Sequence, residues 1–189
     1  MQKNNKDFLG VSNLKNLKVI ITVALFSALS FVFGKFLAIP VGDYMRFSFE
    51  NLPIILSGIL FGPLTGCITG VVADIIGCIL RGYVINPILT FGAALIGFCG
   101  GAVSQLSFKL KQPLMLTITV VSSHLLGSVI VKSIGLSIWY SMDIIFTLGW
   151  RSVNYLVVGI AEIVVLHLIL KNEGFKKQIK GFNGGKNEL

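Results

Sequence analysis

Residues 45–77 read MRFSFENLPIILSGILFGPLTGCITGVVADIIG, and the two apolar runs in this stretch decide the fold. The runs meet at Gly62-Pro63, where a tight turn fits because a proline at the start of a helix sacrifices no hydrogen bond. A helix needs about 20 apolar residues to cross a bilayer, and the second run reaches that length. The pattern predicts a helical hairpin in a membrane, preceded by a charged, aromatic segment.

The rest of the chain is equally apolar. Of its 189 residues, 54% are hydrophobic and 13% are charged, whereas soluble domains carry roughly 25% charged residues. We therefore expect an all-α integral membrane protein, a bundle of six transmembrane helices. The expected spans cover residues 17–39, 51–62, 63–82, 88–108, 114–138 and 146–171. They form one domain, 17–171, between an N-terminal segment, 1–16, and a tail, 172–189.

The distribution of lysine predicts the orientation. Lysines precede the first span, occupy the loop at Lys109 and Lys111, and recur after Lys171. Positive loops favour the cytoplasm, so six spans place all three groups, and with them both termini, on the cytoplasmic side of the plasma membrane. The formal net charge of +8 follows this topology instead of forming a basic face, so no nucleic-acid partner is expected.

Several kinds of chemistry are not expected. The cysteines Cys67, Cys78 and Cys99 lie in apolar runs without CxxC or Cys/His spacing, so neither a metal site nor a disulfide framework is predicted. The chain has no P-loop motif with which to hydrolyse ATP. We expect no catalytic residue, no bound cofactor and no metal.

The three arginines of the chain, Arg46, Arg81 and Arg151, all fall at the outer membrane face in the six-span topology. The positive-inside bias disfavours this placement, and a guanidinium grips carboxylates well. The arginines therefore indicate an anion receptor. Individually, each could instead reach lipid headgroups or pair with a nearby acid such as Glu50.

Aromatic residues gather at the same face: Tyr44, Phe47, Phe49, Tyr83, Trp139, Tyr140 and Trp150. Most of them fit an ordinary interfacial belt, yet the inner face has no Trp or Tyr to match.

Ionisable residues inside membrane spans are functional candidates. Asp74 and His124 fall at similar depth, so they could form a couple, or His124 could link helices as polar glue. No role is assigned to Lys132, Glu162 or His167.

Small residues recur every four positions in three spans, which lets helices approach closely in lipid. Gly62/Gly66/Gly70 and Ala93/Gly97/Gly101 are expected to pack the bundle internally. Ala24/Ala28 could serve internal packing or contact another protein.

Residues 45–77 resemble the substrate-binding subunits (S components) of energy-coupling factor (ECF) vitamin transporters, most closely the folate-type branch. An Arg-aromatic segment, Leu52-Pro53, an FGP turn, spaced glycines and Asp74-Ile-Ile-Gly follow in the family's order. The similarity extends through Asn86-Pro87 and the Gly-rich fourth span. Residues 81–87, RGYVINP, depart from the usual Tyr/Phe-Pro-Gly-Phe pattern, which leaves the vitamin open.

The resemblance implies a six-helix protein that binds a vitamin near the outer face, under a lid at about residues 40–52. It also implies docking on an energy module of a transmembrane scaffold subunit and two cytoplasmic ATPases that use ATP. The family's small-residue docking face matches Ala24 and Ala28. Folate chemistry assigns its carboxylates to the arginines as a group, its flat pterin to aromatic side chains, and the pterin edge to Glu50 or Asp74. The expected substrate-binding residues are Arg46, Phe47, Phe49, Glu50, Asp74, Arg81, Tyr83, Trp150 and Arg151.

Other functions stay open on the residues alone. Pantothenate, riboflavin or a queuosine-type precursor could replace folate. A six-helix intramembrane protease could use Ser122, Ser123 and His124, although neighbouring residues on one helix point in different directions. A self-powered carrier normally shows inverted repeats, and none is evident in this sequence.

Overall fold

The computed structural model describes residues 8–11, 14, 16–41 and 45–175, without the side chains of residues 40, 41, 45 and 46. Five helical stretches are long and apolar enough to cross a membrane: α2 (Leu17–Phe36), α4 (Pro63–Arg81), α5 (Pro87–Leu106), Gln112–Tyr140 and α8 (Ile144–Lys171). The prediction of an all-α membrane protein is confirmed, and the predicted spans end within three residues of the observed helices.

The stretch Gln112–Tyr140 is one continuous helix of three parts. α6 (Gln112–Ser123) passes into a π-helix, η2 (His124–Val131), and then into α7 (Lys132–Tyr140). A π-helix, with hydrogen bonds from residue i to i+5, is rare and frequently occurs at functional sites. The apolar pattern of the sequence predicted the length of this span but not its π-helical centre.

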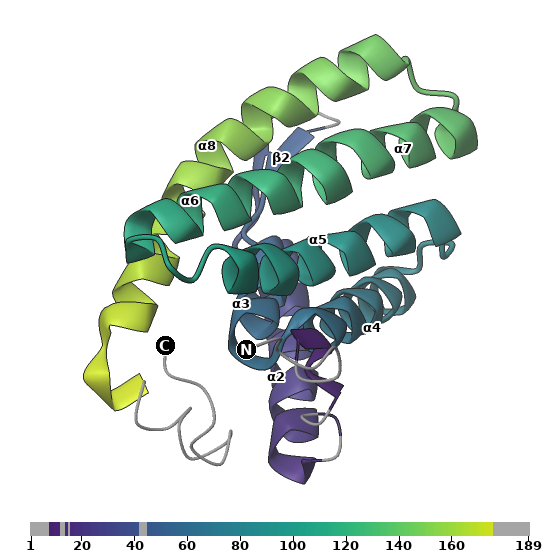
Figure 1. Ribbon diagram of the computed structural model, residues 1–189. Helices are drawn as coiled ribbons and strands as arrows, with labels where there is room; N and C mark the ends of the chain where they lie inside the picture. Colours follow the sequence, from purple (N-terminus) through teal and green to yellow (C-terminus); the bar gives the residue numbers. More distant parts are fainter. Residues whose placement is uncertain (1–7, 12–13, 15, 42–44, 176–189) are drawn as a thin grey trace.

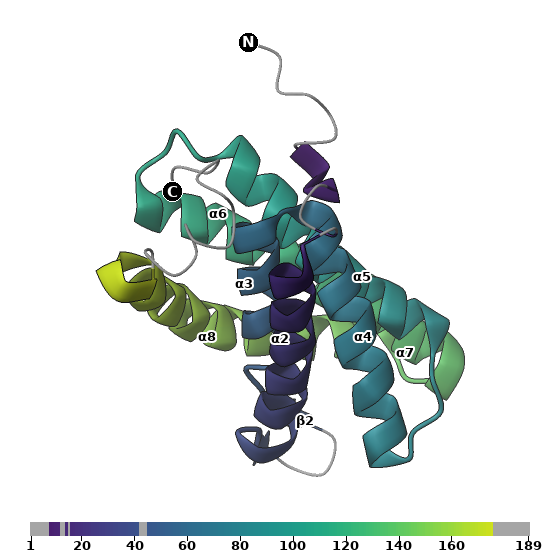
Figure 2. The same cartoon turned by 90° about the horizontal axis from the view of Figure 1, so that it is seen from below.

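The predicted second span is a short central helix, α3 (Asn51–Phe61), whose 11 residues are all buried. At about 1.5 Å per residue it is roughly 16 Å long, about half the hydrocarbon thickness of a bilayer. A helix that is apolar on all sides needs neighbours on all sides, and α3 packs against α2, α4 and α5 in the middle of the bundle (Figures 1 and 2).

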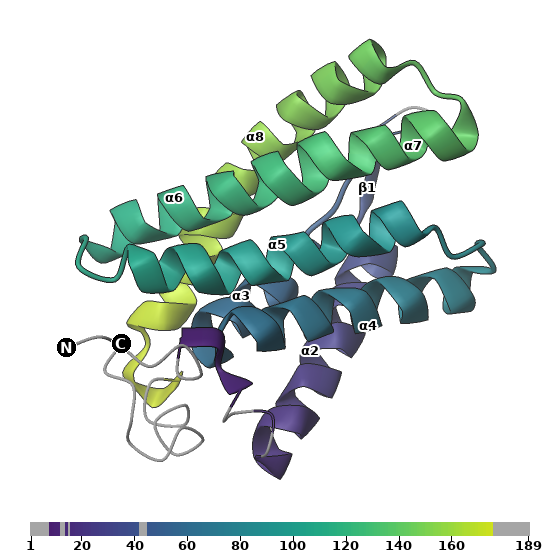
Figure 3. The same cartoon turned by 45° about the vertical axis from the view of Figure 1, so that its right-hand side comes forward.

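Caps and turns fix where the long helices begin and end. Asn86 caps α5, its side-chain oxygen accepting hydrogen bonds from the Ile88 and Leu89 amides at 2.9 and 3.4 Å. Asp143 caps α8 through the Phe146 amide at 2.8 Å. Gly82 ends α4 with a left-handed φ of 69°, which glycine adopts without strain. The α4–α5 and α7–α8 turns therefore lie at one end of the bundle, and the α5–α6 connection lies at the other (Figure 3).

Two glycine ladders bring α4 and α5 into direct backbone contact. A Cβ atom on Gly66 would overlap the carbonyl oxygen of Gly97, and a Cβ on Gly97 would overlap that of Gly66. Gly70 meets the Ala93 carbonyl in the same way, and Gly101 meets Pro63. The prediction that these ladders pack the bundle internally is confirmed.

A small antiparallel hairpin, which no pattern in the sequence predicts, connects α2 to α3. It pairs β1 (Ile39–Val41) with β2 (Met45–Phe47), and Pro40 lies opposite Arg46. The predicted lid at residues 40–52 thus includes β2 and the start of α3. Its residues 42–44, with Tyr44, lie outside the described residues, as do 1–7, 12–13 and 15 of the N-terminal segment and 176–189 of the tail.

Candidate ligand-binding cavity

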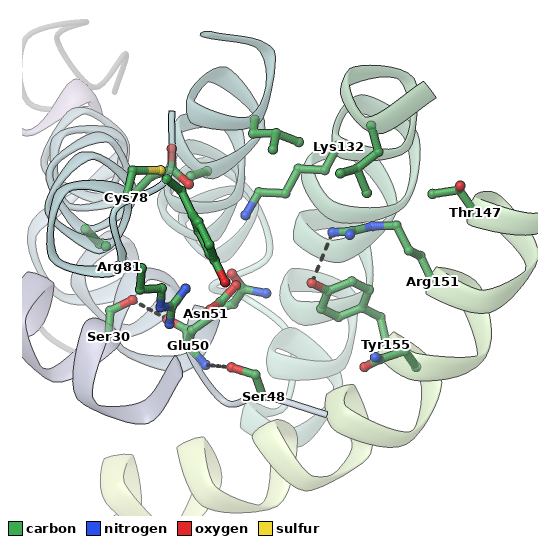
Figure 4. A pocket seen from close by; sticks show the side chains of 18 of the residues that line it. Ser30, Ser48, Glu50, Asn51, Cys78, Arg81, Lys132, Thr147, Arg151 and Tyr155 are labelled. Atoms are coloured by element: carbon green, nitrogen blue, oxygen red, sulfur yellow. Dashed lines mark hydrogen bonds between the residues drawn. The ribbon is translucent and has the colours of Figure 1, made fainter. Parts of the chain in front are cut away.

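A cavity of about 750 Å³ opens between the helices near the end that carries the α4–α5 and α7–α8 turns. Its walls come from α2, α4, α5, α7 and α8, and its lining includes Asn51 and Ile54 from the first turn of α3 (Figure 4). Because α3 is only half as long as its neighbours, the cavity occupies the space that a full-length helix would fill. Its volume falls within the range of about 300–1,000 Å³ typical of small-molecule sites.

Three cationic side chains line this cavity: Arg81 from α4, Lys132 from α7 and Arg151 from α8. The Arg81 guanidinium lies 5.6 Å from the centre of the Phe31 ring. Lys132 is buried, with 8% of its surface exposed, and points into the cavity (Figure 4). No hydrogen bond or ion pair joins its ammonium group to any residue that the structure describes. Buried cations need a compensating anion, so this arrangement suits an acidic ligand.

Two carboxylates share the lining. Asp74 accepts a hydrogen bond from the Thr90 hydroxyl at 2.7 Å. The Glu50 carbonyl accepts one from Ser30 at 2.6 Å, which ties the start of α3 to α2. Gly34 makes room for the charged groups: a Cβ there would lie 2.6 Å from Glu50 Oε2 and 2.7 Å from Arg81 Nη2. Glu50 and Arg81 are therefore held at the same wall.

Aromatic side chains complete the cavity. Tyr83, 60% exposed, and the half-buried Trp150 line it. Phe47 is not part of the lining. It packs on Trp150 with ring centroids 6.0 Å apart and planes inclined by 55°, and so helps to hold the Trp150 ring in place.

Three of the nine predicted residues, Arg46, Phe47 and Phe49, are not placed in the lining. Phe49 lies in the turn that begins α3, where its carbonyl accepts a hydrogen bond from the Leu52 amide at 3.1 Å. The next two residues, Glu50 and Asn51, take the wall positions instead. Arg46 lies in β2, and its side chain lies outside the described part of the chain. The structure thus brings together Glu50, Asp74, Arg81, Tyr83, Trp150 and Arg151 of the predicted set.

The lining residues that sequence reasoning missed include Asn51, Lys132, Asn154 and Tyr155. Asn51 is fully buried, and neither atom of its amide has a hydrogen-bond partner among the described residues. Lys132 could have been found, because an ionisable residue within an apolar span is a functional candidate by default. The other three look like ordinary polar residues in the sequence.

The structure places His124 against Glu162 instead of Asp74. His124 Nε2 lies 2.5 Å from Glu162 Oε2, and Nδ1 lies 3.3 Å from the Ser128 hydroxyl. Both residues are buried. The contact joins η2 to α8, so the interpretation of His124 as polar glue agrees with the geometry. Glu162, to which no role was assigned, is its partner.

Ala24 and Ala28 are exposed on α2, the least buried of the five long helices. Small residues on an exposed helix face allow a helix of another protein to pack closely against it.

A charged cavity inside an apolar helical bundle defines an integral membrane protein that binds a small polar molecule. A family model for the ECF-type riboflavin transporter, S component, matches residues 14–173, so the chain belongs to this family. S components are substrate-binding subunits of vitamin transporters in the plasma membrane, not enzymes. The intramembrane protease alternative is therefore excluded.

The curated relatives are longer than this chain. Uncharacterized protein MG313 of Mycoplasma genitalium is 34% identical over 125 residues, which are 60% of this chain and 43% of MG313. The MG313 homolog of Mycoplasma pneumoniae is 34% identical over 89 residues, 43% of this chain and 31% of the relative. The matched part thus spans less than half of either relative.

Two solved structures share the fold. The crystal structure of FolT bound with folic acid has a TM-score of 0.64 and 22% identity, covering 79% of this chain and 89% of FolT. The S component for biotin from an ECF-type ABC transporter has a TM-score of 0.60 and 18% identity, covering 93% of this chain and 98% of that protein. At these identities the similarity concerns the fold alone.

Proposed function

We propose that this protein is the substrate-binding subunit of an ECF-type importer for folate or a reduced folate. It captures the vitamin at the outer face and delivers it to the cytoplasm after docking on an ATP-driven energy module. The observation that carries the proposal is the convergence of Arg81, Lys132 and Arg151, from three different helices, on one cavity.

The matching family is named after riboflavin, but the charge of the cavity favours folate over riboflavin as the ligand. Riboflavin has no ionised group at neutral pH, so it cannot compensate the positive charge by which the three cations exceed the two carboxylates of the lining, Glu50 and Asp74. Folate carries two glutamyl carboxylates, and carboxylates form strong hydrogen bonds with guanidinium groups. The fold shared with FolT is consistent with folate, and the fold shared with the biotin protein is consistent with any acidic vitamin.

We assign the ligand contacts by chemistry. Arg46, Arg81 and Arg151, joined by Lys132, hold the carboxylates. The pterin ring stacks on Tyr83 or Trp150, while Phe47 packs against Trp150 and Phe49 contributes from the lid. Glu50 or Asp74 accepts hydrogen bonds from the pterin edge. Asn51 is a further candidate, because its amide offers a donor and an acceptor side by side.

We further propose six helical segments with both termini in the cytoplasm. Support comes from Lys109 and Lys111, which follow α5 at the end of the bundle opposite the cavity and match the positive-inside bias. In this topology residues 1–16 and 172–189 are cytoplasmic, and residues 40–52 act as a lid over the ligand.

The partners follow from the family. We propose that a transmembrane scaffold subunit contacts Ala24 and Ala28, and that two cytoplasmic ATPases on that scaffold supply the energy. The exposure of both alanines supports this assignment. This chain binds no cofactor in the proposed mechanism.

A thermal-shift panel on the purified protein in detergent tests the substrate. We expect folate at 100 times its Kd to add about 2.7 kcal/mol of stability and to raise Tm by about 5–10 °C. Riboflavin, biotin, pantothenate and a queuosine-type precursor are expected to leave Tm unchanged. A rise with riboflavin and none with folate would contradict the folate assignment and keep the class of transporter.

Docking is tested by enlarging the exposed alanines. We expect the Ala24→Leu/Ala28→Leu variant to lose co-purification with the energy module and to lose vitamin uptake, because leucine side chains hold two helices apart. Folate binding to the isolated variant should stay within about twofold of wild type, a difference of about 0.4 kcal/mol. Val157→Leu, at an exposed position of α8, is the control and should dock normally. Normal docking of the double variant would remove this face from the interface.

A further inference from the structure

Arg151 is held in place by two elements at the cavity wall. Its Nε donates a hydrogen bond to the Ser128 carbonyl of η2 at 2.6 Å. Its Nη2 donates to the Tyr155 hydroxyl at 3.3 Å (Figure 4), and its guanidinium lies 5.4 Å from the centre of the Tyr155 ring. A guanidinium has five N–H donors, so these contacts leave further donors for a ligand.

A second layer of contacts fixes Tyr155 and Ser128. The Tyr155 ring stacks on the His124 ring, with centroids 4.5 Å apart and planes inclined by 22°. His124 in turn lies between the Ser128 hydroxyl and the carboxylate of Glu162. Ser128 therefore contacts Arg151 through its carbonyl and His124 through its hydroxyl. Glu162 has no exposed surface and is not among the cavity-lining residues.

Two helices contribute to these contacts. His124 and Ser128 both belong to η2, whereas Arg151, Tyr155 and Glu162 belong to α8. The contacts run along the crossing of these two helices, from a buried carboxylate to a cation at the cavity. A simple helix-to-helix link would need only the His124–Glu162 pair and would place no cation.

We propose that Glu162, His124, Ser128 and Tyr155 form a positioning cluster that holds the Arg151 guanidinium ready for a carboxylate of the ligand. The inference rests on the proposed function in that the ligand is acidic. A cation that is already ordered loses less rotamer freedom when the ligand arrives. Glu162 is then a positioning residue that sets affinity for anionic ligands without touching them.

The order of Arg151 can be measured without any ligand. The chain has only three arginines, so the ¹⁵N-labelled full chain in detergent gives few arginine Nε–H signals. The signal that disappears in Arg151→Lys is the signal of Arg151. We expect the Arg151 Nε–H to exchange with water at least about tenfold faster in Glu162→Gln and in Tyr155→Phe than in wild type, because its hydrogen bonds weaken. Ser152→Ala, at an exposed neighbouring position, should leave the exchange rate unchanged. Unchanged exchange in both cluster variants would overturn the proposal.

Folate binding provides the second measurement. Glu162→Gln and Tyr155→Phe should each weaken folate binding by about three- to tenfold, and neither should weaken it further in an Arg151→Ala background. Losses of equal size in that background would overturn the proposal, because the cluster would then act independently of Arg151. If wild type binds no folate, the proposed substrate fails, and the exchange measurement alone decides whether the cluster orders Arg151.

Discussion

Gly66→Leu is expected to lower Tm by about 10 °C or more, or to prevent recovery of folded protein. A side chain at this position has no space, because its Cβ would overlap the Gly97 carbonyl and lie 2.7 Å from the Gly58 Cα. Overpacking a well-packed core costs about 1–3 kcal/mol when side chains can give way, and here the obstacles are backbone atoms. Thermal unfolding of the purified protein, followed by circular dichroism or size exclusion, measures the effect.

Gly77→Ala is the matched control on the same helix. Nothing lies within 4 Å of a Cβ atom at Gly77, and alanine is favoured over glycine in a helix by about 1 kcal/mol. This variant should be as stable as wild type or slightly more stable. Equal Tm values for Gly66→Leu and wild type would show that α4 and α5 are not in the close contact described above.

Lys132→Met is expected to change stability and binding in opposite directions. Removing a buried ammonium group, with no ion pair among the described residues, should raise Tm of the ligand-free protein by about 2–4 °C, equivalent to about 1 kcal/mol. Methionine keeps an unbranched stem that can pack against Gly92, as the lysine stem does. Folate affinity should fall by about 10- to 150-fold, because a charge-assisted hydrogen bond contributes about 1.5–3 kcal/mol.

Lys35→Met is the control for Lys132→Met. Lys35 is an exposed lysine of α2 whose ammonium lies near the Phe31 and Phe36 rings. Its replacement should leave folate affinity within about twofold of wild type, about 0.4 kcal/mol. If both lysine variants lose affinity equally, long-range attraction by positive charge explains the loss, and Lys132 has no special contact with the ligand.

The sequence predicts the helices well because the signals are local. Apolar runs, the Gly62-Pro63 turn and the glycine ladders each report on their own few residues. The π-helical turns of η2 have no such signal, because an apolar run such as His124–Val131 fits an α-helix as well as a π-helix. The three-residue strands around residues 39–47 are likewise too short to leave a pattern.

The cavity is only partly predictable because its lining depends on tertiary packing. Arg81 and Arg151 stand out in the sequence because arginine is rare in this chain and, in the predicted topology, lies on the side that charge bias disfavours. Asn51 does not stand out, because an Asn at the start of a helix normally serves as a cap. The pairing of His124 with Glu162 joins residues 38 positions apart, and only the crossing of η2 with α8 brings them together.

The short length of α3 also sets how far the cavity extends into the bundle. Its first turn contributes Asn51 and Ile54 to the lining of the cavity, so one extra turn there would extend the helix by about 5.4 Å into that space. Depth could therefore be altered by shifting a single helix start, without changing any surface that faces lipid or a partner subunit. Proteins with this architecture have a simple route to accommodating vitamins of different lengths.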